Sequence, residues 1–252
     1  MKAIILAAGK GSRLGNITKE NPKGMIKIFG KSLIERQIQI YRDYGIKEII
    51  VITGHKSENI NFDNVIYIKN QNFEITNMNE SFFCAAEKLT DSIIVSYADI
   101  IFDQKIIQEM IETFADIAVA VNLNWEKSYE GRKFHPLSEA ENILMNENGK
   151  IIQIKKNISK KLHNQKIGEF LGIMKLSKKG AQNILKKYLE LKGKHKGNFH
   201  SSNSLEQCYI TDMLQEMIDS NHNVMPIITK NEWYEIDTKE DLEKLEKSSK
   251  FN

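Results

Sequence analysis

KAIILAAGKGSRL, at residues 2–14, is the segment from which the architecture of this chain can be inferred. Its first part, 2–7, is a short continuous apolar run, which is typical of a parallel strand buried on both faces. The glycine-rich turn that follows exposes backbone N–H groups, and such groups can cradle phosphate oxygens. The segment therefore predicts a buried first strand that leads into a phosphate-binding loop.

The remainder of the first half continues this alternation of strands and helices. Ser32 and Glu35 form a capping-box pattern that begins a helix, and Gly45 ends that helix. Further elements are expected as strands at 48–53, 65–68, 92–98 and 116–121 and as helices at 79–89 and 104–114. An alternation of this kind predicts a mostly parallel sheet with right-handed crossovers.

The second half is less regular and richer in strands. Asn148-Gly149 supplies the positive φ angles of a tight turn, so 142–154 is expected to be a hairpin. Further strands are expected at 168–176, 224–229 and 233–236, and helices at 177–191, 205–220 and 239–247. We predict a single α/β domain over 1–252 that contains a small β-rich lobe at 122–176.

The composition excludes several classes of protein. The 252 residues hold 36 Lys+Arg against 33 Asp+Glu, and this balance is too even for wrapping nucleic acid. Cys84 and Cys208 lie far apart and the six histidines are scattered, so neither a disulfide scaffold nor a zinc site is expected. No apolar run approaches the ~20 residues of a membrane helix, and the apolar run at 3–8 is shorter than a signal-peptide core of ~7–15 residues. We expect a cytoplasmic protein with neither nucleic acid nor a membrane as partner.

Two common phosphate loops do not fit the glycine-rich segment. The Walker A spacing GxxxxGK[ST] is absent, and the dinucleotide pattern GxGxxG would need glycine where the chain has Leu14. The second strand would also end in an acid, whereas this one ends at Thr53-Gly54. Instead, Arg13 follows Gly11 by two residues and adds a cation to the cradle.

LAAGKGSRL followed by Pro22-Lys23 resembles the nucleotidyltransferases that build nucleoside-diphosphate sugars, and their relatives. The resemblance implies a Rossmann-like nucleotidyltransferase fold in which Arg13 and Lys23 contact phosphates and act in catalysis. Asn77 and Ser81 resemble a segment near the base in choline-phosphate cytidylyltransferase-like proteins, although both also suit a helix start. The implied nucleotide-binding residues are Leu6, Ala7, Ala8, Gly9, Gly11, Ser12, Asn77 and Ser81.

Two carboxylates suit a Mg²⁺ ion, which nucleotidyl transfer commonly requires. Asp99 closes a buried strand, and its setting resembles the family's Asp-x-Asp motif with Tyr97 in place of the first Asp. This replacement leaves open whether one or two metals bind. Asp237 matches the family's late WxEIDT segment, with N-capping of the helix near Lys239 as the alternative.

The acceptor is inferred from motifs in the middle of the chain. It lacks the NAGIY-like segment of sugar-nucleotide pyrophosphorylases, and its order of motifs resembles the branch of phosphonate and capsule-associated cytidylyltransferases. An acceptor with a phosphoryl group and an ammonium needs cations and a carboxylate in one pocket. We expect Arg132 and Lys156 to hold the phosphoryl end, and Glu139 or Glu169 to face the ammonium, the alternative being exposed charges on the lobe. The sequence alone does not distinguish Lys156 from its neighbour Lys155.

The sequence thus predicts a Mg²⁺-dependent enzyme that transfers CMP from CTP and releases pyrophosphate. The expected acceptor is a small phosphorylated or phosphonylated amino compound. Phosphoglutamine in capsule modification is favoured, with 2-aminoethylphosphonate and phosphocholine as the other choices. One alternative is a sugar-1-phosphate nucleotidyltransferase that uses UTP, dTTP or GTP. Another is a regulatory protein that binds nucleotide without catalysis.

Overall fold

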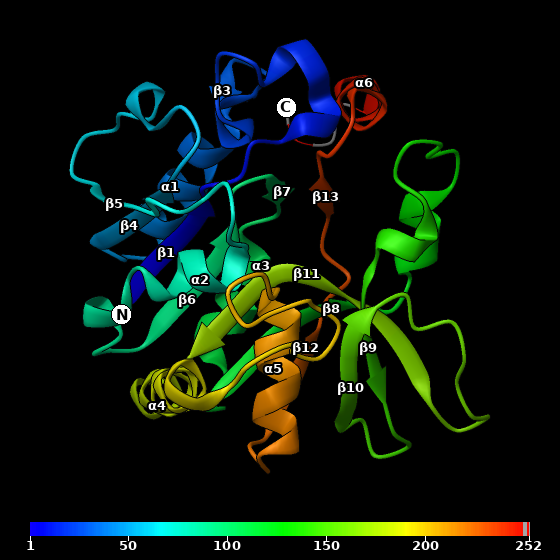
Figure 1. The fold of residues 1–252 in the computed structure, drawn as a ribbon. Helices are drawn as coiled ribbons and strands as arrows, with labels where there is room; N and C mark the ends of the chain where they lie inside the picture. The colour runs from blue at the N-terminus through cyan, green and yellow to red at the C-terminus, as the bar shows by residue number, and fades with distance from the viewer. Residues whose placement is uncertain (249–250, 252) are drawn as a thin grey trace.

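A computed structural model describes residues 1–248 and 251, and a nine-stranded mixed sheet forms its centre (Figure 1). Its strands are β1 (Lys2–Ala7), β4 (Glu48–Thr53), β5 (Ile66–Lys69), β6 (Ile93–Tyr97), β8 (Ile117–Asn122), β9 (Glu141–Met145), β10 (Ile151–Lys156), β11 (Lys166–Leu176) and β12 (Val224–Ile228). Their order is β10-β9-β11-β6-β1-β4-β5, with β8 beside β11 and β12 beside β8. The predicted α/β class, a mixed sheet flanked by helices, is confirmed, and four of the strand pairs in this sheet are parallel and four antiparallel.

Six α-helices lie among the described residues: α1 (Leu33–Asp43), α2 (Met78–Phe83), α3 (Lys105–Glu112), α4 (Lys178–Lys194), α5 (Ile210–Asp219) and α6 (Lys239–Ser248). The predicted capping box begins α1, because the Glu35 backbone N–H donates to Ser32 Oγ at 3.2 Å. The Ser32 N–H donates in return to Glu35 Oε2 at 3.3 Å. None of the helices in this part of the chain is long and apolar enough to cross a membrane.

The sheet has a parallel half and an antiparallel half. In the parallel half, β1 lies between β4 and β6, and its residues Ile4 and Ile5 are fully buried. This burial on both faces explains the unbroken apolar run in the sequence. In the antiparallel half, β11 pairs with β6, β8 and β9, and β9 pairs with β10 as the predicted hairpin. The first half of the chain therefore gives most of the parallel strands, β12 adds a further parallel pair with β8, and 122–176 gives most of the antiparallel strands.

Strand β11 joins the two halves by bending at Gly172. The φ angle of Gly172 is +69°, and a Cβ there would lie 2.6 Å from the ring of Tyr97. Glycine is required for two reasons. A residue with a side chain rarely adopts this positive φ, and its Cβ would also clash with the Tyr97 ring. Before the bend β11 pairs with β9, and after it with β6. The bend brings the β9–β10 hairpin next to the carboxyl end of β6.

Two short sheets complete the fold: β2 (Lys27–Ile28) with β3 (Lys31–Ser32), and β7 (Ile100–Phe102) with β13 (Trp233–Glu235). The pairing of β7 with β13 continues as a hydrogen bond from the Ile236 N–H to the Asp99 carbonyl at 3.0 Å. The indole of Trp233 donates to the Leu171 carbonyl at 2.9 Å. These bonds hold the late segment of the chain against the end of β6.

Two predicted helices differ from those observed. The helix expected at 79–89 is divided into α2 and a 3₁₀ turn at Ala86–Lys88. The helix expected at 205–220 begins only at Ile210, because the Tyr209 N–H donates to the Asp212 side chain in a cap. The preceding polar residues are used in loop bonds, such as that between Ser202 Oγ and Asp212.

Candidate active site

A cavity of about 300 Å³ opens at the carboxyl ends of β1 and β6. This is the edge of a parallel sheet at which ligand sites gather. All but two of the site residues predicted from the sequence line it: Leu6, Ala7, Ala8, Gly9, Gly11, Ser12, Arg13, Lys23, Asn77, Ser81, Asp99, Glu139, Lys156 and Asp237. The exceptions are Arg132 and Glu169.

The glycine-rich loop forms one wall and is held by its own backbone. Gly11 has φ +61°, and a Cβ there would come within 3.0 Å of the Lys23 side chain. The hydroxyl of Thr18 donates to the Gly11 carbonyl at 2.8 Å. Gly54 packs more closely still, since a Cβ on it would lie 2.6 Å from the Ala8 carbonyl oxygen. The loop therefore has the tight, N–H-exposing shape that phosphate binding requires.

Lys23 lies between the two carboxylates that were predicted to bind metal. Its Nζ is 2.7 Å from Asp99 Oδ2 and also pairs with Asp237 Oδ1. Burial opposes the charge on this lysine, but the attraction of Asp99 and Asp237 outweighs it and raises the pKa of Lys23 above its usual range. Arg13 Nη2 lies 2.9 Å from Asp237 Oδ2. Both predicted phosphate-binding cations thus neutralise these carboxylates.

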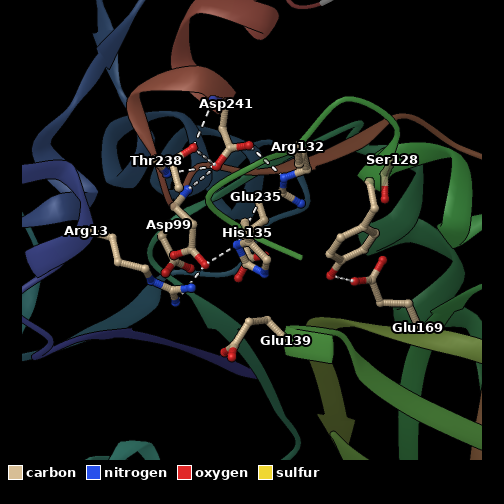
Figure 2. Close-up of polar contacts among 12 residues, drawn as sticks. Arg13, Asp99, Ser128, Arg132, His135, Glu139, Glu169, Glu235, Thr238 and Asp241 are labelled. Carbon is tan, nitrogen blue, oxygen red and sulfur yellow. Dashed lines mark hydrogen bonds and ion pairs between the residues drawn. The ribbon is translucent and has the colours of Figure 1, made fainter. Parts of the chain in front are cut away.

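Asp237 has a further partner that the sequence interpretation missed. His135 Nδ1 lies 2.6 Å from Asp237 Oδ2, and His135 Nε2 lies 3.8 Å from Glu235 Oε2 (Figure 2). Burial opposes ionisation of Asp237, but the hydrogen bond with His135 and the charge of Lys23 hold its pKa well below the usual range. Burial, together with the charges of Asp237 and Asp99, raises the pKa of Glu235. The only sequence signals for these residues are the His135-Pro136 pair and the acid within WYEID.

The carboxylates fit a divalent cation. Asp99 Oδ1 is buried and has no hydrogen-bond partner, so it presents an unused oxygen donor. His135, Glu235 and Asp237 each offer a ligand atom, and these atoms lie within 4.8 Å of one another. Carboxylate oxygens suit Mg²⁺, whereas an imidazole is more typical of transition metals. Asp237 is not the helix cap, because Thr238 Oγ1 accepts from the Asp241 N–H at 3.3 Å.

Asn77 and Ser81 line the cavity and also form the start of α2. The Asn77 side chain accepts from the Met78 N–H at 2.8 Å, which is a helix-capping role. Ser81 Oγ accepts from the Asn70 amide at 3.0 Å. These bonds fix both side chains at the edge of the cavity.

The wall opposite the glycine-rich loop comes from the β9–β10 hairpin and the residue before α5. Lys156 Nζ is 3.2 Å from Glu139 Oε2 and 4.4 Å from the centroid of the Tyr209 ring. Glu141, which pairs in register with Lys156, accepts from Tyr97 Oη at 3.0 Å and from Thr211 Oγ1 at 3.4 Å. Burial raises the pKa of Glu141 to about 7, against the lowering effect of Lys156. This wall carries one ammonium and two carboxyl groups.

Arg132 lies outside the cavity because its guanidinium is used in a buried ion pair. Its Nε is 2.7 Å from Asp241 Oδ1, and the two side chains are only 4% and 5% exposed. Asp241 Oδ2 in turn accepts the backbone N–H groups of Asp237 at 3.0 Å and Thr238 at 2.8 Å. Figure 2 shows Arg132 directed towards Asp241. The predicted phosphoryl contact is therefore replaced by support of the segment that carries Asp237.

Glu169 is also directed away from the cavity. It is 2% exposed and accepts a hydrogen bond from the Tyr129 hydroxyl, on the side of Figure 2 away from Arg13. Burial raises the pKa of Glu169 to about 8. Tyr129 belongs with Trp125 and Ala140 to a small apolar cluster, so these aromatics are core residues and do not line the cavity. Of the two acids predicted to face an ammonium, Glu139 lines the cavity and Glu169 does not, and Glu141, which was not predicted, lines it as well.

Comparison with known proteins identifies nucleotidyltransferases as relatives of this chain. Residues 3–162 match the family described as MobA-like NTP transferase domain. The chain is 31% identical to a CTP:phosphoglutamine cytidylyltransferase of Campylobacter jejuni, over 96% of this chain and 98% of that one. It is 34% identical to a choline-phosphate cytidylyltransferase of Streptococcus pneumoniae over 40% of this chain and 46% of the relative.

The solved structures agree on the fold. The structure of CTP:phosphocholine cytidylyltransferase from Streptococcus pneumoniae matches with a TM-score of 0.71 and 23% identity, over 98% of both chains. An inositol-1-phosphate CTP transferase from T. maritima matches with a TM-score of 0.70 and 21% identity, over 98% of this chain and 94% of that chain. The arrangement of strands described above is thus shared along the whole length of these proteins.

Proposed function

Because this chain belongs to the MobA-like NTP transferase family, we propose that it transfers CMP from CTP to a small phosphorylated amino compound. The observation that carries the proposal is the composition of one cavity. A phosphate loop with Arg13 and Lys23 lies at one wall, Asp99 and Asp237 lie beside it, and a charged wall that includes Lys156 faces them. The whole-length similarity to a CTP:phosphoglutamine cytidylyltransferase supports CTP as donor and phosphoglutamine as the favoured acceptor.

In the proposed reaction an oxygen of the acceptor's phosphoryl group attacks the α-phosphorus of CTP in line. The new bond joins that oxygen to the α-phosphorus, the bond between the α-phosphorus and its bridging oxygen breaks, and pyrophosphate leaves with the electron pair. The acceptor oxygen is already ionised near neutral pH, so no covalent enzyme intermediate is required. Transfers of this kind depend mainly on positioning and on neutralisation of charge.

Each residue of the nucleotide end has a role in this scheme. Backbone N–H groups of the loop at 8–12 bind the phosphates, and Asn77 and Ser81 lie towards the base. Arg13 and Lys23 neutralise the charge of the departing pyrophosphate. Asp99 and Asp237 would hold Mg²⁺, which supplies Lewis-acid charge to the α-phosphate when bound.

The lobe at 122–176 would receive the acceptor, since it contributes His135, Glu139, Glu141 and Lys156 to the cavity. Two carboxyl groups and an ammonium suit a charged amino compound better than the neutral ring of a sugar phosphate. The role in capsule modification that the sequence resemblance implies is part of this proposal.

Pyrophosphate release tests the proposal. CTP, UTP, dTTP and GTP are each incubated with Mg²⁺ and with phosphoglutamine, 2-aminoethylphosphonate, phosphocholine or glucose-1-phosphate. We expect release with CTP and an amino-bearing acceptor, with phosphoglutamine the fastest. Release with glucose-1-phosphate alone would favour a sugar-nucleotide enzyme. Nucleotide binding without release in any mixture would favour a regulatory protein.

A further inference from the structure

In the cavity wall formed by Glu139, Glu141, Lys156 and Tyr209, the ammonium of a lysine lies over the ring of a tyrosine. Lys156 Nζ lies 4.4 Å from the centroid of the Tyr209 ring, and Tyr209 lines the cavity. Glu139 holds the same ammonium from a distance of 3.2 Å. A cation over an aromatic face, with a carboxylate nearby, is also how proteins bind quaternary ammonium ligands. In this protein a lysine takes the position that such a ligand would need.

The other aromatic rings of the cavity are engaged as well. Lys10 Nζ lies 5.9 Å from the centroid of the Phe73 ring. The Tyr97 ring packs against the bend at Gly172, where a Cβ would lie 2.6 Å away, and against the edge of Phe170. Among the described residues, the lining therefore holds no aromatic ring without such a neighbour. A ligand that depends on cation–π contact would compete with Lys156 for the Tyr209 ring and with Lys10 for the Phe73 ring.

The same wall can read the two ends of an amino-acid group. Lys156 and Glu141 are partners in register on the antiparallel strands β10 and β9, so their side chains share one face. An ammonium with three N–H donors can bond a free carboxylate of the ligand, and Glu141 can accept N–H bonds from a primary ammonium. A quaternary ammonium has no N–H group to donate. Tyr97 and Thr211 already fix the Glu141 carboxyl by hydrogen bonds.

We propose that Lys156 and Glu141 form a subsite that selects acceptors with both a free carboxylate and a primary ammonium, and that Lys156 excludes quaternary ammonium compounds by holding the Tyr209 ring. This inference rests on the proposed function, because it concerns the acceptor end of the same cavity. The order of preference that follows is phosphoglutamine first, then 2-aminoethylphosphonate, which lacks the carboxylate, and phosphocholine last. Lys156 is thereby a specificity residue and does not hold the acceptor's phosphoryl group.

Calorimetric titration of three proteins tests the subsite: the wild type, Lys156→Met and Lys155→Met. Each is saturated with a CTP analogue whose α–β bridge is a methylene group, so that binding is measured without turnover. Methionine keeps an unbranched side chain that reaches the position of Cε and lacks the charged ammonium beyond it, which frees the Tyr209 ring. Lys155 is the adjacent residue of β10, lies outside the cavity lining and is the matched control.

The wild type should bind phosphoglutamine at least about tenfold more tightly than phosphocholine, and Lys156→Met should reduce or invert that ratio by about tenfold or more. Lys155→Met should retain the wild-type ratio, and retained affinity for the analogue shows that Lys156→Met is folded. An equal loss of affinity for all three acceptors in Lys156→Met would overturn the inference, since it would place Lys156 on the phosphoryl group. An unchanged ratio, or a wild type that binds none of the acceptors, would also overturn it.

Pyrophosphate release is measured in parallel with CTP. If the wild type shows the expected binding ratio and the expected shift on Lys156→Met but releases no pyrophosphate, the proposed function fails while the subsite stands. If pyrophosphate is released but the ratio does not respond to Lys156→Met, the function stands and the subsite fails.

Discussion

Asp99 pairs with Lys23 through one oxygen, while its other oxygen is buried without a partner. We predict that Asp99→Asn lowers the rate of pyrophosphate release at least about 10²-fold, because it removes charge at the point where the transition state needs it. The fold should persist, since the side chain keeps its shape. Asp63→Asn, at an exposed position, is the matched control. Turnover of Asp99→Asn close to the wild-type rate would contradict the assignment of this carboxylate to the metal.

Arg132 is predicted to act through structure alone. Arg132→Ala leaves Asp241 buried without its ion partner, and breaking such a pair costs about 3–5 kcal/mol in the free energy of unfolding. Urea denaturation measures this loss, with the exposed neighbour Lys133→Ala as the control. Since Asp241 also binds the Asp237 backbone, the variant should bind divalent cation more weakly as well. A free energy of unfolding equal to that of the control would show that the Arg132–Asp241 ion pair does not stabilise the fold.

At the scale of elements, β11 places Glu169 against the 3₁₀ helix Trp125–Tyr129, away from water. Its pKa of about 8 lies above the ordinary value, so the folded protein holds a proton that the unfolded chain releases. Stability therefore falls as pH rises towards 8, because deprotonation favours the unfolded state. The contribution lost between pH 4 and pH 9 is about 2–5 kcal/mol.

Glu169→Gln should remove this part of the pH dependence while keeping an acceptor for the Tyr129 hydroxyl. Urea denaturation of both proteins between pH 5 and pH 8.5 gives the difference directly. We expect the wild type to lose stability relative to the variant as pH rises. Parallel curves for the two proteins would contradict a buried, protonated Glu169.

The sequence predicts those elements whose signals are local. The capping box of Ser32 and Glu35 lies within four residues, and the apolar run of β1 is continuous, so both were identified correctly. Strand β7 is only three residues long and is stabilised by β13, which lies far along the chain, so no local sequence pattern predicts this strand. The helix expected from 205 is predicted five residues too long, because its observed start at Ile210 is set by one hydrogen bond from the Tyr209 N–H to the Asp212 side chain.

The site residues follow the same division. Arg13 and Lys23 belong to one continuous motif, and the structure brings both to the cavity. Which charges of the lobe face the cavity depends on partners distant in sequence. Arg132 is withdrawn by Asp241 on α6, and the choice between Lys155 and Lys156 depends on the register of β10 with β9. Neither fact can be read from composition or spacing.

For the whole molecule, the cavity exists only when both halves of the sheet are assembled. The parallel half provides the glycine-rich loop and Asp99, and the antiparallel lobe provides Glu141 and Lys156. The C-terminal segment returns through β13 to add Asp237, and an apolar cluster that includes Leu14 from the N-terminal part and Leu245 from α6 supports it. Donor and acceptor would thus approach each other from opposite halves of one fold.

Whether this fold joins CMP to a phosphorylated amino compound can be observed by ³¹P NMR of a reaction that contains the protein, CTP, Mg²⁺ and phosphoglutamine. We predict that the CTP resonances are replaced by those of pyrophosphate and of a CDP-linked product in equal amounts, and that chelation of Mg²⁺ prevents this. Unchanged CTP, or pyrophosphate that appears with CMP and no linked product, would show that the protein does not catalyse this transfer.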